Sequence, residues 1–205
     1  NIAIKEYNSV AAALSFKKAH ELAPENVVAL FNLAVVEAQL KQYDASNLTL
    51  DKILSIDKGY ALAYRLLISN AVAQDKEQQL IEKFQNMVDL DPQAIWPRIA
   101  LAKKYASDGD FVKSNSFLEP VSDYLNYPAV YFITLSRNYL QQNKLASVKE
   151  LFNDWRKVSP DNPLAYMMEV DILDRAKDFS YALEVVKQGL SRPLLRTHYR
   201  LSALE

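Results

Sequence analysis

The chain has 205 residues and a formal net charge of -1, so it lacks the excess positive charge that attracts phosphate backbones, which argues against nucleic-acid binding. It contains no cysteine, which excludes disulfides, thiolate chemistry and zinc fingers and fits either a reducing or an oxidising compartment. No apolar run reaches the roughly 18 residues that a membrane-spanning helix needs.

Residues 1–26 are predicted to form the second helix of a truncated leading unit, and a 34-residue pattern then repeats without a shift. Five full units are predicted, over residues 27–60, 61–94, 95–128, 129–162 and 163–196. Residues 197–205 are predicted to begin a further helix or a cap. Because each unit can bury its apolar face only against its neighbours, we expect residues 1–205 to form one continuous solenoid.

The joints between units share a short motif in which proline ends one helix before the next begins. Pro24, Pro92 and Pro160 occupy the same position of three joints, and Lys58 replaces proline in a fourth. The joints therefore fix where each unit starts.

Two positions of each unit are predicted to form the shared core. Position 7 lies in the first helix, and in four units it is leucine: Leu33, Leu67, Leu101 and Leu135. Position 24 lies in the second helix and is always apolar: Phe16, Leu50, Phe84, Leu118, Phe152 and Val186. Ser46 and Ser114, at position 20, are small residues that we expect to let paired helices approach closely.

The period, the proline joints and the core positions together resemble the tetratricopeptide repeat (TPR) family over nearly the whole chain. The resemblance implies an all-α fold, a right-handed superhelical solenoid of antiparallel helix pairs. It also implies a non-catalytic scaffold that binds a peptide or helix of a partner protein in its concave groove.

In this family the first helix of each unit lines the groove, chiefly at positions 2, 5, 9, 12 and 13. The groove residues predicted on this basis are Phe31, Arg65, Trp96, Ile99, Lys103, Ile133, Arg137 and Met167. Position 9 is basic in the middle units and becomes Asp171 in the fifth, which predicts an acidic far end. Such a surface suits an amphipathic helix or extended peptide that carries carboxylates. Alternatively, the apolar members pack between adjacent first helices.

No catalytic, metal or cofactor site is predicted, and we expect the chain not to be an enzyme. His20 and His198 lie in opposite terminal units, so they cannot combine in a metal cluster or a triad within one chain. The three glycines are too far apart to form a phosphate-binding loop.

Two residues depart from the pattern. Glu169 occupies position 7 of the fifth unit, and because an unpaired buried carboxylate would cost several kcal/mol, we expect that helix to have rotated. Pro120 falls within the predicted second helix of the third unit, which it is expected to bend.

The stretch of residues 91–102 is similar to long bacterial TPR proteins, including lipoproteins of the exopolysaccharide and PEP-CTERM type. This resemblance implies a periplasmic or envelope scaffold that is part of a larger protein, while the compartment itself is not determined. The alternative function is a recruiting or regulatory segment of a larger enzyme or export or sorting machine, such as a glycosyltransferase system. The expected partner is a protein or peptide of unknown identity, and exposed repeat ends leave weak homodimerisation open.

Overall fold

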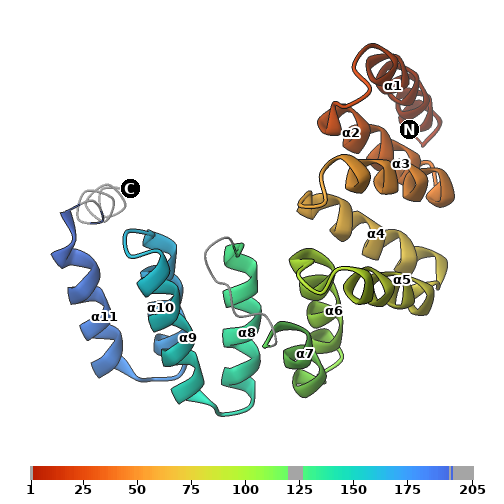
Figure 1. Cartoon of the computed structure of the whole chain (residues 1–205). Helices are drawn as coiled ribbons and strands as arrows, with labels where there is room; N and C mark the ends of the chain where they lie inside the picture. Colours follow the sequence, from red (N-terminus) through yellow and green to blue (C-terminus); the bar gives the residue numbers. More distant parts are fainter. Residues whose placement is uncertain (1, 120–126, 194, 196–205) are drawn as a thin grey trace. The chain divides into compact units, whose positions relative to one another are not determined.

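The structure, a computed structural model, describes residues 2–119, 127–193 and 195 (Figure 1). Every regular element in this part of the chain is an α-helix. The chain divides into two compact units, residues 1–100 and 101–205. Each unit is an α-solenoid of antiparallel helix pairs, so the all-α prediction is confirmed.

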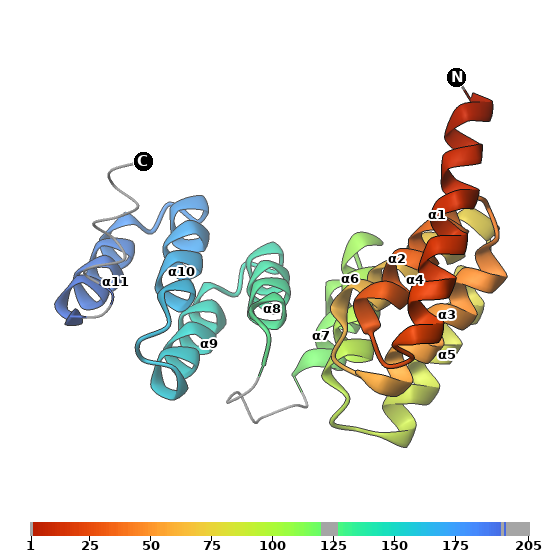
Figure 2. The same cartoon turned by 90° about the horizontal axis from the view of Figure 1, so that it is seen from above.

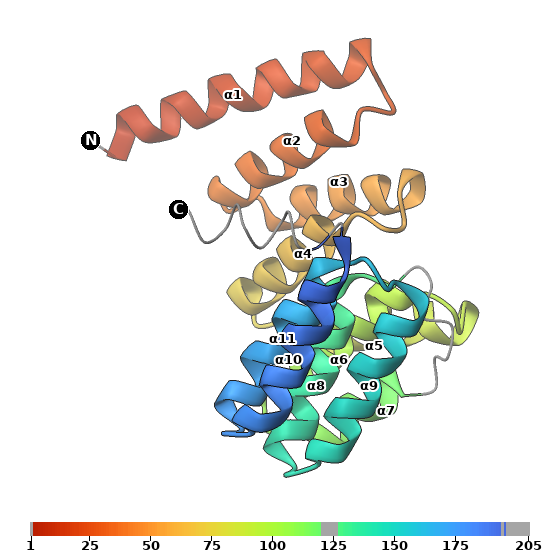
Figure 3. The same cartoon turned by 90° about the vertical axis from the view of Figure 1, so that its left-hand side faces the viewer.

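In the first unit the helices α1 to α5 pack against one another in chain order, as Figure 3 shows for α1 to α4. Its helices are α1 (Ile2–Leu22), α2 (Val27–Gln39), α3 (Tyr43–Ile56), α4 (Ala61–Gln74), α5 (Glu77–Leu90) and the start of α6 (Ile95–Ser107). The first helices α2 and α4 also contact each other directly. Residues at equivalent positions of α2 and α4 can therefore contribute to one face.

The second unit continues the same arrangement, with α8 to α11 following one another in Figure 2. After the end of α6 its helices are α7 (Phe111–Leu118), α8 (Ala129–Gln141), α9 (Leu145–Val158), α10 (Pro163–Arg175) and α11 (Phe179–Ser191). Here the first helices of two consecutive repeats, α8 and α10, contact each other. None of the helices in the described part of the chain is long and apolar enough to cross a membrane.

The turn that follows each first helix has the same backbone conformation, with one residue at positive φ. These residues are spaced 34 apart: Lys41, Asp75, Gly109, Asn143 and Lys177. In each turn the next N–H donates to a carbonyl five residues earlier, as Gln42 does to Glu37 at 2.8 Å. This hydrogen bond is typical of a Schellman end, which satisfies carbonyls that the helix leaves free. The division of the whole chain into five repeats of one solenoid stays a prediction.

At three joints between repeats, the side chain at position 4 of the following first helix donates a hydrogen bond to the backbone of the joint. Tyr64 Oη donates to the Lys58 carbonyl at 3.0 Å, and Tyr166 Oη donates to the Pro160 carbonyl at 3.0 Å. Arg98 Nε makes the equivalent bond to the Pro92 carbonyl at 2.8 Å. At these three joints a part-buried carbonyl is thus satisfied by a side chain six residues later.

The predicted core is buried as expected. The position-7 leucines are at most 5% exposed: Leu33, Leu67, Leu101 and Leu135. The position-24 residues Leu50, Phe84, Leu118 and Phe152 are at most 2% exposed, whereas Phe16 and Val186, nearer the ends, are half-buried. Each buried residue of this size contributes about 1.5–3 kcal/mol relative to exposure, so the two columns supply much of the stability.

The prediction that the helix around Glu169 has rotated is wrong. Glu169 is fully buried on α10 and forms an ion pair with Arg156 of α9, which is 8% exposed. The Arg156 guanidinium also lies 5.6 Å from the centre of the Tyr166 ring. A buried carboxylate is tolerated here because an arginine from the preceding repeat compensates its charge.

Several predictions fall outside the described residues. They concern Pro120, His198 and the segment 197–205. The described part of α7 ends at Leu118, before that proline. The side chain of His20 is also outside the described set.

Candidate functional site

The first-helix face of the first unit combines exposed apolar side chains with one free cation. Val28 on α2 and Leu62 on α4 are 57% and 41% exposed. Phe31 is half-buried, with its ring centre 5.5 Å from that of Tyr60. Arg65 is exposed and has no ion-pair partner among the described residues. This face can therefore offer a guanidinium and apolar contacts to a ligand.

The two predicted groove residues at the start of α6 have different surroundings. Trp96 is half-buried, and its ring centre lies 6.4 Å from that of Tyr64. Ile99 is only 3% exposed and lies in a stretch of α6, residues 97–102, that is buried throughout. The expectation that Ile99 contacts a ligand is therefore corrected: its side chain belongs to the packed interior, as the alternative interpretation of the apolar positions allowed.

In the second unit, the basic residues predicted at position 9 are exposed. Lys103 on α6 and Arg137 on α8 have no ion-pair partner among the residues that the structure describes. Ile133, one turn before Arg137, is half-buried. Residues four apart share one helix face, so α8 presents a cation beside a partly exposed apolar side chain.

The acidic far end is weaker than the sequence suggested. Asp171, at position 9 of α10, accepts a hydrogen bond from Arg175 Nε at 3.1 Å in an ion pair one turn apart. Its negative charge is thus partly compensated within α10. Asp174 on the same helix is exposed.

Several other basic residues at the surface of the described chain are paired with aspartates. These pairs are Lys76–Asp44, Lys83–Asp51, Lys104–Asp108, Lys157–Asp154 and Arg192–Asp161. Exposed pairs contribute only about 0–1 kcal/mol each, so they matter less for stability than for charge. They neutralise the surface locally, whereas Arg65, Lys103 and Arg137 keep their charge available.

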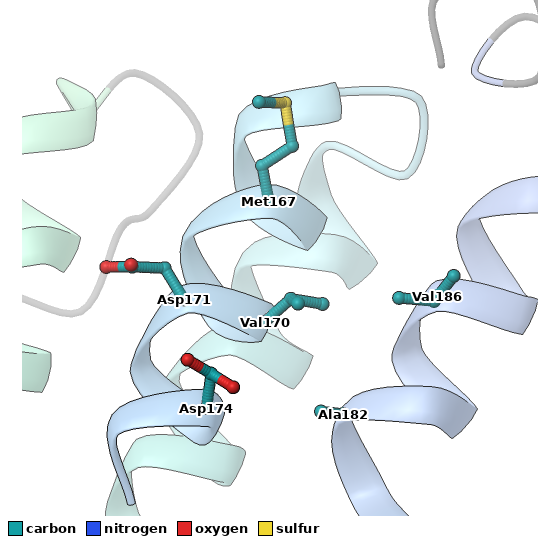
Figure 4. Close-up of a pocket in the computed structure, with 6 residues that line it drawn as sticks. All are labelled: Met167, Val170, Asp171, Asp174, Ala182 and Val186. Carbon is teal, nitrogen blue, oxygen red and sulfur yellow. The ribbon is translucent and has the colours of Figure 1, made fainter. Parts of the chain in front are cut away.

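Met167, the last predicted groove residue, is 38% exposed and lines a pocket of about 390 Å³ between α10 and α11. The lining residues are Met167, Val170, Asp171, Asp174, Ala182 and Val186. In Figure 4 Val170 and Val186 face each other across the gap, while both carboxylates lie on the α10 side. The pocket is suited to an apolar side chain with a basic neighbour.

The sequence pattern did not single out two buried asparagines at position 10. Asn70 Nδ2 donates to Ser46 Oγ and to Asn47 Oδ1, both at 2.9 Å, and joins α4 to α3. Ser46 Oγ in turn donates to the Ala34 carbonyl at 2.8 Å, so the serine is more than a small residue. We call this network the asparagine clasp.

The asparagine clasp occurs again in the second unit. Asn138 Nδ2 donates to Ser114 Oγ at 2.6 Å and to Asn115 Oδ1 at 2.9 Å, and Ser114 Oγ donates to the Ala102 carbonyl. The signal in the sequence was a Ser-Asn pair followed by another asparagine 23 residues after the first one. This pattern occurs twice, and the two occurrences are two repeat lengths apart.

No metal-binding arrangement is found in residues 2–119, 127–193 and 195, where three or more His, Asp or Glu side chains never gather in a suitable way. Burial raises the pKa of Tyr64 to about 12, with a smaller contribution from the charge of Asp57. Tyr64 therefore remains a protonated donor at neutral pH.

Comparison with known proteins identifies the fold. The sequence matches no protein-family model and no curated protein. Yeast Tom70 is similar in structure, with a TM-score of 0.59 and 15% identity over 93% of this chain and 41% of Tom70. The C-terminal part of a TPR protein from Cytophaga hutchinsonii has a TM-score of 0.56 and 14% identity over 91% of this chain and 75% of its own.

PilW, a type IV pilus biogenesis factor, gives a TM-score of 0.53 and 16% identity over 96% of this chain and 93% of its own. Identities of 14–16% relate these proteins by fold alone. The chain has the tetratricopeptide-repeat fold.

Proposed function

We propose that this chain is a non-catalytic interaction scaffold whose first-helix faces bind a peptide or helix of a partner protein. One observation carries the proposal: Arg65, Lys103 and Arg137 are exposed and have no ion-pair partner among the described residues.

The chemistry of these faces favours an amphipathic acidic ligand. Arg65 lies near exposed Leu62 on α4, and Arg137 lies one turn from Ile133 on α8. Apolar side chains of a ligand would bury surface against such residues at about 25 cal/mol per Å². Carboxylates beside them would pair with the guanidinium groups, which steers association and fixes orientation.

The test is a double charge reversal within the second unit, Lys103→Glu with Arg137→Glu. The probe is an amphipathic acidic peptide selected from a random peptide library on the intact chain, and its Kd is measured by fluorescence anisotropy. We expect affinity to fall about tenfold or more, since each lost charge contact changes into a repulsion.

The matched control reverses two other exposed lysines, Lys144→Glu with Lys187→Glu, which lie in a turn and on α11. It changes the net charge by the same amount, so a general charge effect would weaken both variants equally. Equal affinity of the Lys103 and Arg137 variant and the unchanged protein would contradict the proposal.

We further propose that this scaffold works in the bacterial envelope. Support comes from the sequence resemblance of residues 91–102 and from the likeness in fold to PilW, which is described as a pilus biogenesis factor. Fractionation of cells that express the complete protein tests the location. Recovery with cytoplasmic markers alone would contradict it.

A further inference from the structure

A second pocket lies in the first unit, between the joint of α3 with α4 and the joint of α5 with α6, and has a volume of about 370 Å³. We call it the joint pocket. Its apolar lining residues are Leu54, Tyr64, Met87, Leu90, Ala94, Ile95, Trp96 and Pro97. Leu54 and Tyr64 are buried, whereas Leu90 is 88% exposed at the edge. An open apolar pocket beside an exposed leucine is typical of a protein-interaction site.

The joint pocket exists because this joint departs from the others in sequence. Lys58 replaces the proline, and the next residue, Gly59, has no side chain. A Cβ added at Gly59 would lie 3.5 Å from Trp96 Nε1 and 3.1 Å from Asp57 Oδ1. The equivalent positions of the other joints hold Glu25, Gln93, Tyr127 and Asp161. A longer residue would occupy space that the indole of Trp96 now borders.

Two opposite charges line the joint pocket without pairing with each other. Lys58 and Asp91 are both exposed, and neither has an ion-pair partner among the described residues. The Asp91 carboxylate accepts one hydrogen bond, from the Gln93 N–H at 3.1 Å. A ligand can therefore place an acidic group near Lys58 and a basic group near Asp91, which fixes its direction.

The hydrogen-bonding groups of the joint pocket indicate what the ligand must supply. The Lys58 carbonyl already accepts from the Tyr64 hydroxyl at 3.0 Å, and Asp57 Oδ1 accepts from the Gly59 N–H at 2.8 Å. The indole N–H of Trp96 has no hydrogen-bond partner in the part of the chain described. A peptide carbonyl is a suitable acceptor for this donor, because the indole N–H can only donate.

We propose that the joint pocket binds an extended segment of a partner protein that carries one large apolar residue flanked by an acidic residue on one side and a basic residue on the other. The apolar side chain enters between Trp96, Met87 and Leu90. The flanking charges pair with Lys58 and Asp91. This surface lies at helix joints and shares Trp96 with the predicted groove residues, but it contains none of the three cations Arg65, Lys103 and Arg137.

The experiment combines peptide selection with a local reporter. Short random peptides are selected on the intact chain, and binding is followed by NMR of the indole N–H groups. The chain has two tryptophans, and the variant Trp155→Phe assigns the signal of Trp96. We expect selected peptides to contain the acidic, apolar and basic pattern and to shift the Trp96 signal.

Surface variants then test the contacts without disturbing the core. Leu90→Ser and Lys58→Glu are each expected to weaken binding about tenfold, the first by removing apolar contact and the second by charge repulsion. A peptide whose acidic residue is changed to lysine should bind the Lys58→Glu variant better than the unchanged protein. Lys144→Glu, the same change at an exposed turn of the second unit, should leave affinity within about twofold.

Three results would overturn the proposal. The first is peptide binding that leaves the Trp96 signal in place or is insensitive to both Leu90→Ser and Lys58→Glu. The second is loss of the same binding in the Lys103→Glu, Arg137→Glu variant, which would place the peptide on a first-helix face and leave the proposed function intact. The third is a dimer of the free chain that Leu90→Ser converts to a monomer, which would make a second copy the occupant.

Discussion

Two side-chain contacts between consecutive repeats, which we call joins, bury polar groups in different ways. In the first unit, α4 meets α3 through the asparagine clasp, in which Asn70 donates to Ser46 and Asn47. In the second unit, α10 meets α9 through the ion pair of Glu169 with Arg156. Asn70 is 1% exposed and Glu169 is fully buried. Both joins hold one repeat to the next, but only the second depends on charge.

The difference shows how a polar contact between repeats is tolerated. A neutral amide that donates to two acceptors has a small desolvation cost, and each such bond stabilises by about 1 kcal/mol net. Two charges taken out of water have a much larger cost, which their attraction offsets only while both are present. The ion pair is therefore the more fragile of the two joins.

The largest effect is expected from separating the ion pair. Glu169→Leu restores the leucine of position 7 but leaves Arg156, 8% exposed, without its counter-charge. We expect the free energy of unfolding to fall by about 3–5 kcal/mol. The double variant Glu169→Leu, Arg156→Leu should recover most of this loss, because well-packed apolar residues often replace a buried pair without cost.

Urea unfolding followed by circular dichroism measures both variants. The control is the comparison of the free energy of unfolding of the single variant with that of the double variant. It separates the effect of a buried charge without a counter-charge from the effect of lost packing. A single variant as stable as the unchanged protein would show that Arg156 reaches solvent and that the ion pair is dispensable.

A smaller loss is expected from breaking the asparagine clasp. Asn70→Ala and Asn138→Ala each remove two hydrogen bonds and leave the acceptors Asn47 and Asn115 unsatisfied. We expect each variant to lose about 1–3 kcal/mol in urea unfolding, and similar amounts because the bonds are equivalent. Asn153→Ala, at an exposed position, is the control and should change little. Clearly unequal losses would mean that the two clasps are not equivalent.

The regular features of this fold could be predicted from the sequence. Buried position-7 leucines such as Leu33 and Leu135 follow from periodicity, because a helix places every recurrence on the same face. The period also located the small residue Ser46, although not its hydrogen bonds to Asn70 and the Ala34 carbonyl. Contacts between repeats depend on which side chains meet, and one unit's pattern does not contain that information.

The irregular features could not be predicted in the same way. Glu169 was recognisable as an exception, but its partner Arg156 lies on another helix. Ile99 occupies a groove position of the family pattern, yet close packing around α6 buries it. The joint pocket depends on Gly59, whose effect becomes visible only with Trp96 beside it. Each depends on packing between elements rather than on a pattern within one.

Tyrosine hydrogen bonds at the joints allow a comparison of the same contact in both units. Tyr64→Phe and Tyr166→Phe each remove one bond to a carbonyl, and we expect each to lose about 1 kcal/mol at neutral pH. A pH effect is expected for Tyr64. Its folded pKa of about 12 lies above the unfolded value of 10.0, because burial and, to a lesser degree, Asp57 disfavour the phenolate.

The sign of this effect follows from linkage. The contribution of Tyr64 is fully present below about pH 10 and is lost as pH rises toward about 12, since the unfolded chain gives up its proton first. We expect the free-energy difference of about 1 kcal/mol between the unchanged protein and Tyr64→Phe to disappear or to change sign between about pH 9 and pH 11.5. Urea unfolding at both pH values measures it. A pH-independent difference would mean that the Tyr64 pKa is not raised in the folded chain.

The smallest effect is expected at a half-buried ion pair, between Lys149 and Asp178, whose Nζ and Oδ2 are 2.7 Å apart. The hydrogen bond from Lys149 and that from the Tyr181 N–H lower the pKa of Asp178, which caps α11. Its contribution is present above the usual carboxyl pKa and is lost as pH falls through the lowered value. Asp178→Asn should flatten this acid dependence slightly.

Added salt should weaken the ion pair of Lys149 with Asp178 but hardly affect the pair of Arg156 with Glu169, because ions screen only charges near solvent. Urea midpoints at low and high salt, compared for Asp178→Asn and for the Arg156 and Glu169 double variant, measure the contrast. Equal salt sensitivity of the two pairs would contradict the burial of Glu169.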